Sequence, residues 1–72
     1  MKMKKQEFEN NDKPLVLILS WHSSSDNTMS EYYDFDEADD FLKQYEQDFP
    51  EYFHFMRRNK AAIEANRKLF GL

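Results

Sequence analysis

The chain has 72 residues, a mass of 8.8 kDa and a formal net charge of −4. A chain of this length folds as one small domain, and its thin core leaves no room for a deep cleft that encloses a cofactor. The absence of cysteine excludes disulfides and cysteine-type zinc sites, and the single glycine excludes glycine-rich phosphate loops. The longest apolar run, Leu15 to Leu19, is too short to cross a membrane, and acidic residues follow the first lysines where a secretory signal would be apolar. We therefore expect a cytoplasmic protein with no membrane partner.

Residues 1–13 are polar and, apart from Phe8, lack apolar periodicity. This composition predicts a flexible polar N-terminal arm. Pro14 marks the entry to the ordered part of the chain, because proline fits the first position of a strand. We expect residues 14–72 to form a single domain.

The next two segments predict a β-hairpin. Leu15–His22 is a continuous apolar run, which indicates a strand buried on both faces and central in its sheet. Ser23–Asn27 is typical of a turn, with Asn27 as the best candidate for a positive φ. Thr28–Phe35 alternates between its two faces, as a second strand does.

A helix is predicted from Glu37 to about Gln47, ending before Pro50. Its apolar residues recur at helical spacing: Ala38, Phe41, Leu42 and Tyr45. Asp34 or Asp36 is expected to cap the amino end of this helix.

Residues 51–58 allow two interpretations. Phe53 and Phe55 alternate with His54 and Met56, which favours a strand. In the alternative, Pro50 opens one long helix that runs to Phe70 and gives a ββαα fold. A third antiparallel strand would cover the free edge of the first strand, so we predict the strand and a sheet of order 2-1-3.

The last element is a predicted helix from Lys60 to Phe70, capped by Asn59 and ended by Gly71. The complete prediction is a small two-layer α+β domain with the element order ββαβα. Its inner helical stripe is expected to be Ala62, Ile63, Asn66, Leu69 and Phe70. Six aromatic side chains are expected to fill the core: Phe35, Phe41, Tyr45, Phe53, Phe55 and Phe70.

Catalytic and metal chemistry receive little support. His22, Ser23–Ser25 and Asp26 contain the residue types of a hydrolytic triad, but neighbours in one turn lack the orientation and oxyanion hole that a triad needs. His22 and His54, with Asp26 or Glu51, make a thin metal-ligand set without a spacing signature. We expect a non-enzymatic protein without cofactor or metal.

Charge is distributed unevenly along the chain: residues 26–51 carry −9 and residues 52–72 carry +4. Six carboxylates fall within ten residues: Glu31, Asp34, Asp36, Glu37, Asp39 and Asp40. Helix capping explains some of them, and a solvated helix face is the alternative interpretation of the rest. Such a cluster also suits a basic groove on a protein partner.

Four aromatic residues are predicted to be partly exposed and to anchor a protein partner or a homodimer: Trp21, Tyr32, Tyr33 and Tyr52. A less favoured alternative is a nucleic-acid-binding protein that stacks bases on Tyr52, Phe53 or Phe55. Its phosphate contacts would be Arg57, Arg58, Lys60, Arg67 and Lys68. The sequence pI of about 5.0 weighs against this alternative.

With its acidic cluster and without a catalytic set, this small domain resembles, in size and charge, the inhibitors that phages and mobile elements encode, such as anti-CRISPR and anti-restriction proteins. The resemblance implies an acidic nucleic-acid mimic that binds and blocks a basic-surfaced, nucleic-acid-handling protein. The expected contacts are the six carboxylates and the four aromatic anchors.

Overall fold

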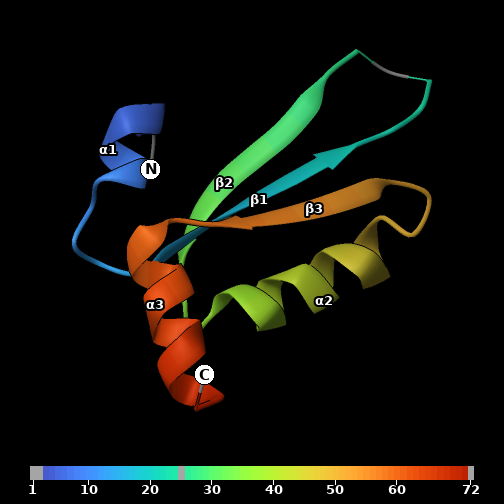
Figure 1. Ribbon diagram of the computed structural model, residues 1–72. Coiled ribbons are helices and arrows are strands. Elements are labelled where there is room, and N and C mark those ends of the chain that lie inside the picture. The colour runs from blue at the N-terminus through green and yellow to red at the C-terminus, as the bar shows by residue number, and fades with distance from the viewer. Residues whose placement is uncertain (1–2, 25, 72) are drawn as a thin grey trace.

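The computed structural model describes residues 3–24 and 26–71 and contains a three-stranded antiparallel sheet with helices on both sides (Figure 1). The elements in chain order are α1 (Lys5–Glu9), β1 (Leu15–Trp21), β2 (Thr28–Asp34), α2 (Ala38–Asp48), β3 (Phe53–Arg58) and α3 (Lys60–Leu69). The strand order is β2-β1-β3. This arrangement confirms the predicted ββαβα fold and its central first strand, and the alternative with one long C-terminal helix is wrong.

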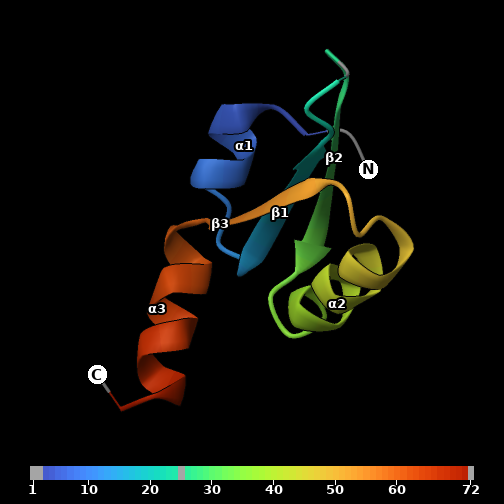
Figure 2. The same ribbon diagram turned by 90° about the vertical axis from the view of Figure 1, so that its right-hand side faces the viewer.

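The strand register divides the sheet into two faces. On the inner face, Val16 lies opposite Tyr33, and Ile18 lies opposite Met56. Helix α2 covers this face, while α1 lies on the other side of the sheet (Figure 2). The outer face carries Leu15, Leu17, Leu19 and Trp21 of β1, Thr28, Ser30, Tyr32 and Asp34 of β2, and Phe53, Phe55 and Arg57 of β3.

The hydrophobic core lies between the inner face and the helices α2 and α3. Its buried residues are Val16, Ile18, Ala38 and Ala62, with Tyr33, Phe35, Leu42, Tyr45 and Met56 packed against them. Small residues at Ala38 and Ala62 let the two helices approach the sheet closely. The core is therefore as thin as the chain length requires.

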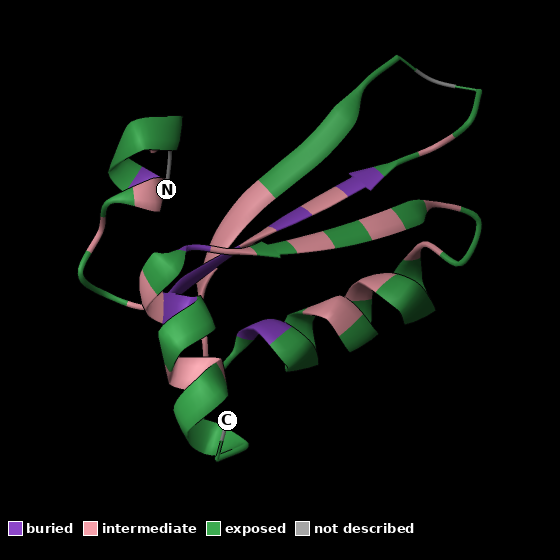
Figure 3. Ribbon diagram, viewed as in Figure 1, coloured by how far each residue is buried: buried purple, intermediate pink, exposed green. Residues whose placement is uncertain are grey.

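The predicted set of core aromatics is wrong for four residues. Phe53 and Phe55 are more than half exposed, Phe70 is 67% exposed and Phe41 is 40% exposed. Because β3 alternates, His54 and Met56 face α2 and the two phenylalanines point to the outer face. The stripes on β3 show the alternating exposure (Figure 3). Ile63 and Leu69 of the expected inner stripe of α3 are exposed as well. The first strand also departs from burial on both faces, since Trp21 is exposed at its end.

The N-terminal segment differs from the expected flexible arm. Residues 5–9 form α1, and its residue Phe8 is only 2% exposed. Its ring packs 5.2 Å from the ring of Tyr32 on the outer face. This buried ring is one of the contacts that dock the polar segment on the sheet.

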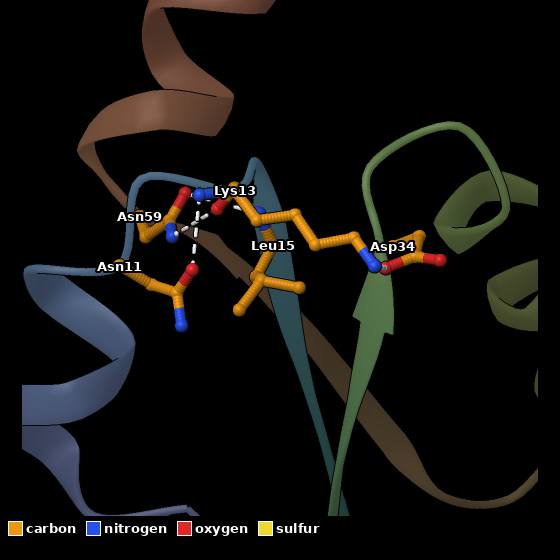
Figure 4. Close-up of polar contacts among 5 residues, drawn as sticks. All are labelled: Asn11, Lys13, Leu15, Asp34 and Asn59. Atoms are coloured by element: carbon orange, nitrogen blue, oxygen red, sulfur yellow. Dashed lines mark hydrogen bonds and ion pairs between the residues drawn. The ribbon is translucent and has the colours of Figure 1, made fainter.

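Asn59 connects α1, β1 and α3. Figure 4 shows its contacts with Lys13 and Leu15. Its side-chain oxygen accepts hydrogen bonds from the backbone N–H groups of Ala62 and Leu15, at 2.8 and 3.1 Å. Its amide donates to the backbone carbonyls of Phe8 and Lys13, both at 3.0 Å. The predicted cap of α3 is confirmed, and its buried amide holds the N-terminal segment in addition.

Other predicted turns and caps have mixed outcomes. Gly71 has φ 70°, which confirms its left-handed conformation after α3. Asn27 lacks the predicted positive φ, since no described residue other than Gly71 has one. Glu37 occupies the position before α2 without a side-chain cap, so the predicted cap by Asp34 or Asp36 is wrong. Within the described part of the chain, no helix is long and apolar enough to cross a membrane.

Candidate interaction surfaces

Four carboxylates at the start of α2 form the acidic ridge, which we define as Asp36, Glu37, Asp39 and Asp40. All four are exposed, and none has an ion pair among the described residues. The other two members of the predicted cluster have different surroundings. Asp34 lines a second hollow together with Asp36 but pairs with Lys13 at 3.2 Å, and Glu31 is partly buried opposite Ile18 on the inner face.

A groove of about 400 Å³ adjoins the acidic ridge between the start of α2 and the end of α3. Its apolar lining includes Val16, Met56 and Phe70. Asp36, Asp39 and Arg58 also line the groove. The ridge is therefore next to apolar surface, with one cation in the same groove.

The four predicted aromatic anchors do not share a surface. Tyr32 lies against α1, where its hydroxyl donates to the carbonyl of Met3 at 3.2 Å. Tyr52 lies beside His22, with ring centroids 5.2 Å apart. Both tyrosines are partly buried, whereas Trp21 is exposed on the outer face.

Tyr33 belongs to the inner face. Its ring stacks on Phe41 with centroids 4.2 Å apart, and its hydroxyl forms a hydrogen bond with that of Tyr45. Burial, reinforced by the Tyr45 contact, raises the pKa of the Tyr33 hydroxyl above its usual range. These contacts give Tyr33 a structural role.

The aromatic face, defined as Trp21, Phe53 and Phe55, is the surface that sequence reasoning missed. These side chains are 37%, 56% and 52% exposed, and the rings of Trp21 and Phe53 lie 5.8 Å apart. They lie on neighbouring strands, opposite the side that α2 covers. The alternation of residues 53–58 shows that Phe53 and Phe55 share one face of the strand. Only the packing of the sheet against α2 determines that this face points outward.

The basic residues of the alternative function are divided among several surfaces. Arg57 points to the outer face and forms an ion pair with Glu9, whereas Arg58 lines the groove on the inner side. Lys60 begins α3, and Arg67 and Lys68 are in its last turn. No single cationic track along β3 results from this arrangement.

Both histidines have local partners. The side chain of His54 bridges Ser20 Oγ at 2.7 Å and the carbonyl of Phe49 at 3.1 Å. Because a carbonyl only accepts, Nε2 of His54 carries the proton, and the hydroxyl of Ser20 donates to Nδ1 when the ring is neutral. Ser20 is 1% exposed and cannot meet a substrate without rearrangement. This pair therefore joins β1, β3 and the end of α2.

His22 lies at the hairpin end, where its Nδ1 accepts from the hydroxyl and the N–H of Ser24 at 2.6 and 3.1 Å. Glu51 is 3.9 Å from its Nε2. Ser23 and Asp26 are exposed in the same turn, and Ser25 lies outside the described residues. Across residues 3–24 and 26–71, no three His, Asp or Glu side chains are grouped in a way that could hold a metal ion.

No protein family, curated protein or solved structure matches this chain. The acidic ridge, the groove and the aromatic face are therefore the features from which a function is inferred.

Proposed function

We propose that this chain is a non-enzymatic interaction module whose acidic ridge binds a protein with a basic surface. The observation that carries the proposal is that Asp36, Glu37, Asp39 and Asp40 are all exposed and that none of them forms an ion pair with a described residue. Like charges at helical spacing repel one another, which costs a few tenths of a kcal/mol per pair. A partner's lysines and arginines would relieve this repulsion.

The partner class follows from the same charges. A basic surface that accepts a row of closely spaced carboxylates is typical of proteins that bind a phosphate backbone. The chain would then act as a small inhibitor that competes with nucleic acid, as the resemblance to anti-CRISPR and anti-restriction proteins implies. Electrostatic complementarity of this kind mainly accelerates association and makes it sensitive to salt.

The groove adds a place for an apolar anchor. A partner side chain that enters between Val16 and Phe70 would bring neighbouring basic residues next to Asp36 and Asp39. Buried anchors supply most of the affinity of such contacts, whereas exposed charges supply rate and specificity.

The test begins with tagged protein, a nuclease-treated lysate of the native host and mass spectrometry. Association of the purified captured protein is then measured at increasing salt. The variant Asp36→Asn, Glu37→Gln, Asp39→Asn and Asp40→Asn should associate at least about tenfold more slowly at low salt and lose most of the salt dependence. A nucleic-acid oligonucleotide bound by the captured protein should compete with the wild-type chain.

A matched control removes the same amount of charge from exposed positions elsewhere, by Glu7→Gln, Asp12→Asn, Asp26→Asn and Glu64→Gln. This control should keep most of the association rate, because steering depends on where the charge lies. Equal rates for the ridge variant and the wild type would contradict the proposal. Retention of nucleic acid alone, lost on neutralising Arg57, Arg58, Arg67 and Lys68, would favour the alternative function instead.

A further inference from the structure

The outer face of the sheet is covered over only part of its length. Phe8 of α1 packs on Tyr32, and Glu9 pairs with Arg57, so α1 covers the end of the sheet near the start of β1. Beyond that point the rows Ser30–Leu19–Phe55 and Thr28–Trp21–Phe53 follow. In Figure 1, α1 lies near one end of the sheet and the hairpin extends away from it.

The uncovered part of the outer face carries no charged residue. Its six residues are Leu19, Trp21, Thr28, Ser30, Phe53 and Phe55. The two charged residues of the outer face, Asp34 and Arg57, are both paired within the chain, with Lys13 and Glu9. This part of the surface is therefore uncharged and has an apolar centre, which is unusual for a chain in which a third of the residues are charged.

We propose that the aromatic face binds the aromatic face of a second copy of this chain, so that two sheets pack face to face. Each copy has a net charge of −4, so two copies can approach closely only through a surface that brings no carboxylates together. The aromatic face meets this condition. The groove does not, because a two-fold contact there would bring Asp36 and Asp39 of one copy near those of the other.

The position of α2 supports the same arrangement. Helix α2 packs on the inner face, so a contact through the outer face leaves the acidic ridges of both copies on the outside of the dimer.

Single-stranded nucleic acid fits the aromatic face less well. Stacking proteins pair their aromatic residues with cations that meet the phosphates. The aromatic face has none, and Arg57, farther along the outer face on β3, is already paired with Glu9.

The exposed area sets the strength of this dimer. The exposed fractions of Trp21, Phe53 and Phe55 correspond to roughly 200–350 Å² of aromatic surface. A stable interface buries about 800 Å² on each partner. Leu19, Thr28 and Ser30 extend the contact, but we expect a reversible dimer with a dissociation constant in the micromolar range or weaker, on the order of 10 µM to 1 mM.

Trp21 is the single tryptophan of the chain and reports on this contact directly. Sedimentation equilibrium from about 5 µM to 1 mM should show a monomer–dimer equilibrium, and the tryptophan emission should shift to the blue over the same range, because its exposed edge becomes buried. The substitution Phe55→Thr should raise the dissociation constant at least about tenfold. Phe70→Thr removes an equally large exposed ring just after the end of α3 and should leave the equilibrium unchanged.

A chain that stays monomeric up to about 1 mM would overturn the proposal. So would equal weakening by Phe70→Thr, since the contact would then not be made by the aromatic face. A twelve-residue deoxythymidine oligonucleotide serves as a further probe: a change in Trp21 emission on its addition to a monomeric chain would assign this face to nucleic acid. None of these outcomes depends on the acidic ridge, so this inference stands or falls separately from the proposed function.

Discussion

The side-chain amide of Asn59 donates to the backbone carbonyl of Phe8, 51 positions earlier in the chain, at 3.0 Å. The same side chain caps α3 through the N–H of Ala62 and receives the N–H of Leu15 at the start of β1. Its side chain forms four hydrogen bonds, as many as an amide usually makes. One fully buried residue thus fixes the relative positions of three elements.

We expect Asn59→Ala to lower the free energy of unfolding by about 3 kcal/mol, because it removes a helix cap and leaves several buried backbone groups without a partner. Asn59→Ser keeps an oxygen for the cap but loses the two amide donors, so its loss should be smaller than that of alanine. Urea unfolding followed by circular dichroism measures both. Losses below about 1 kcal/mol for both variants would contradict the role of this side chain.

Phe8 should contribute to stability although it lies in a polar segment. Phe8→Ala is expected to cost about 3 kcal/mol, since a ring that is 2% exposed is lost from its packing against Tyr32. Phe70→Ala is the control, because Phe70 is 67% exposed. Thermal unfolding of the two variants should separate them clearly, and equal midpoints would show that α1 does not dock on the sheet.

The alternation of β3 predicts opposite outcomes for two neighbouring residues. Met56 packs against the core, so Met56→Thr should lower the free energy of unfolding by about 2 kcal/mol. Phe55 is about half exposed, and Phe55→Thr should cost less than about 1 kcal/mol. Unfolding is measured at about 2 µM protein, because the proposed dimer is dissociated at that concentration and does not add to the measured stability. A reversed order would place Phe55 in the core and shift the register of β3.

Stability should fall at alkaline pH through Tyr33. The pKa of this hydroxyl is raised in the folded chain from an ordinary value of 10.0, so above that pH the folded state binds more protons than the unfolded state. The associated stabilisation is complete below about pH 10 and decreases as the pH rises further. In Tyr33→Phe, the unfolding midpoint should decline less steeply between about pH 10 and pH 11. An unchanged slope would contradict this assignment.

The sequence was sufficient to predict the fold but not the core. The run Leu15–Leu19 and the turn after it determine a central strand, and the third strand follows from the need to cover its edge. Alternation shows that Phe53 and Met56 lie on opposite faces, yet it does not say which face α2 covers. Ranking residues by hydrophobicity selects the phenylalanines, whereas the structure turns Met56 and His54 inward and partly buries them.

The candidate surfaces were predictable to a similar extent. The carboxylates at the start of α2 are exposed because a helix presents its polar side to solvent. Asp34 and Glu31 differ from these carboxylates in their surroundings. The pairing of β2 with β1 places Asp34 on the outer face, where Lys13 pairs with it, and Glu31 on the inner face, where it is partly buried. The roles of Phe8 and Asn59 depend on contacts between distant segments, which no local pattern records.

The short helix α1 determines how much apolar surface the domain presents to its surroundings. With α1 in place, only the rows beside the hairpin remain open. Without it, Leu15, Leu17 and Tyr32 would join Trp21 and Phe55 in one apolar strip along the whole sheet, and the amide of Asn59 would lose one of its acceptors. A shortened chain lacking these first residues would thus expose a larger apolar surface and be more prone to precipitate. The polar N-terminal segment, which has little apolar pattern in the sequence, thus keeps part of the apolar sheet surface away from solvent.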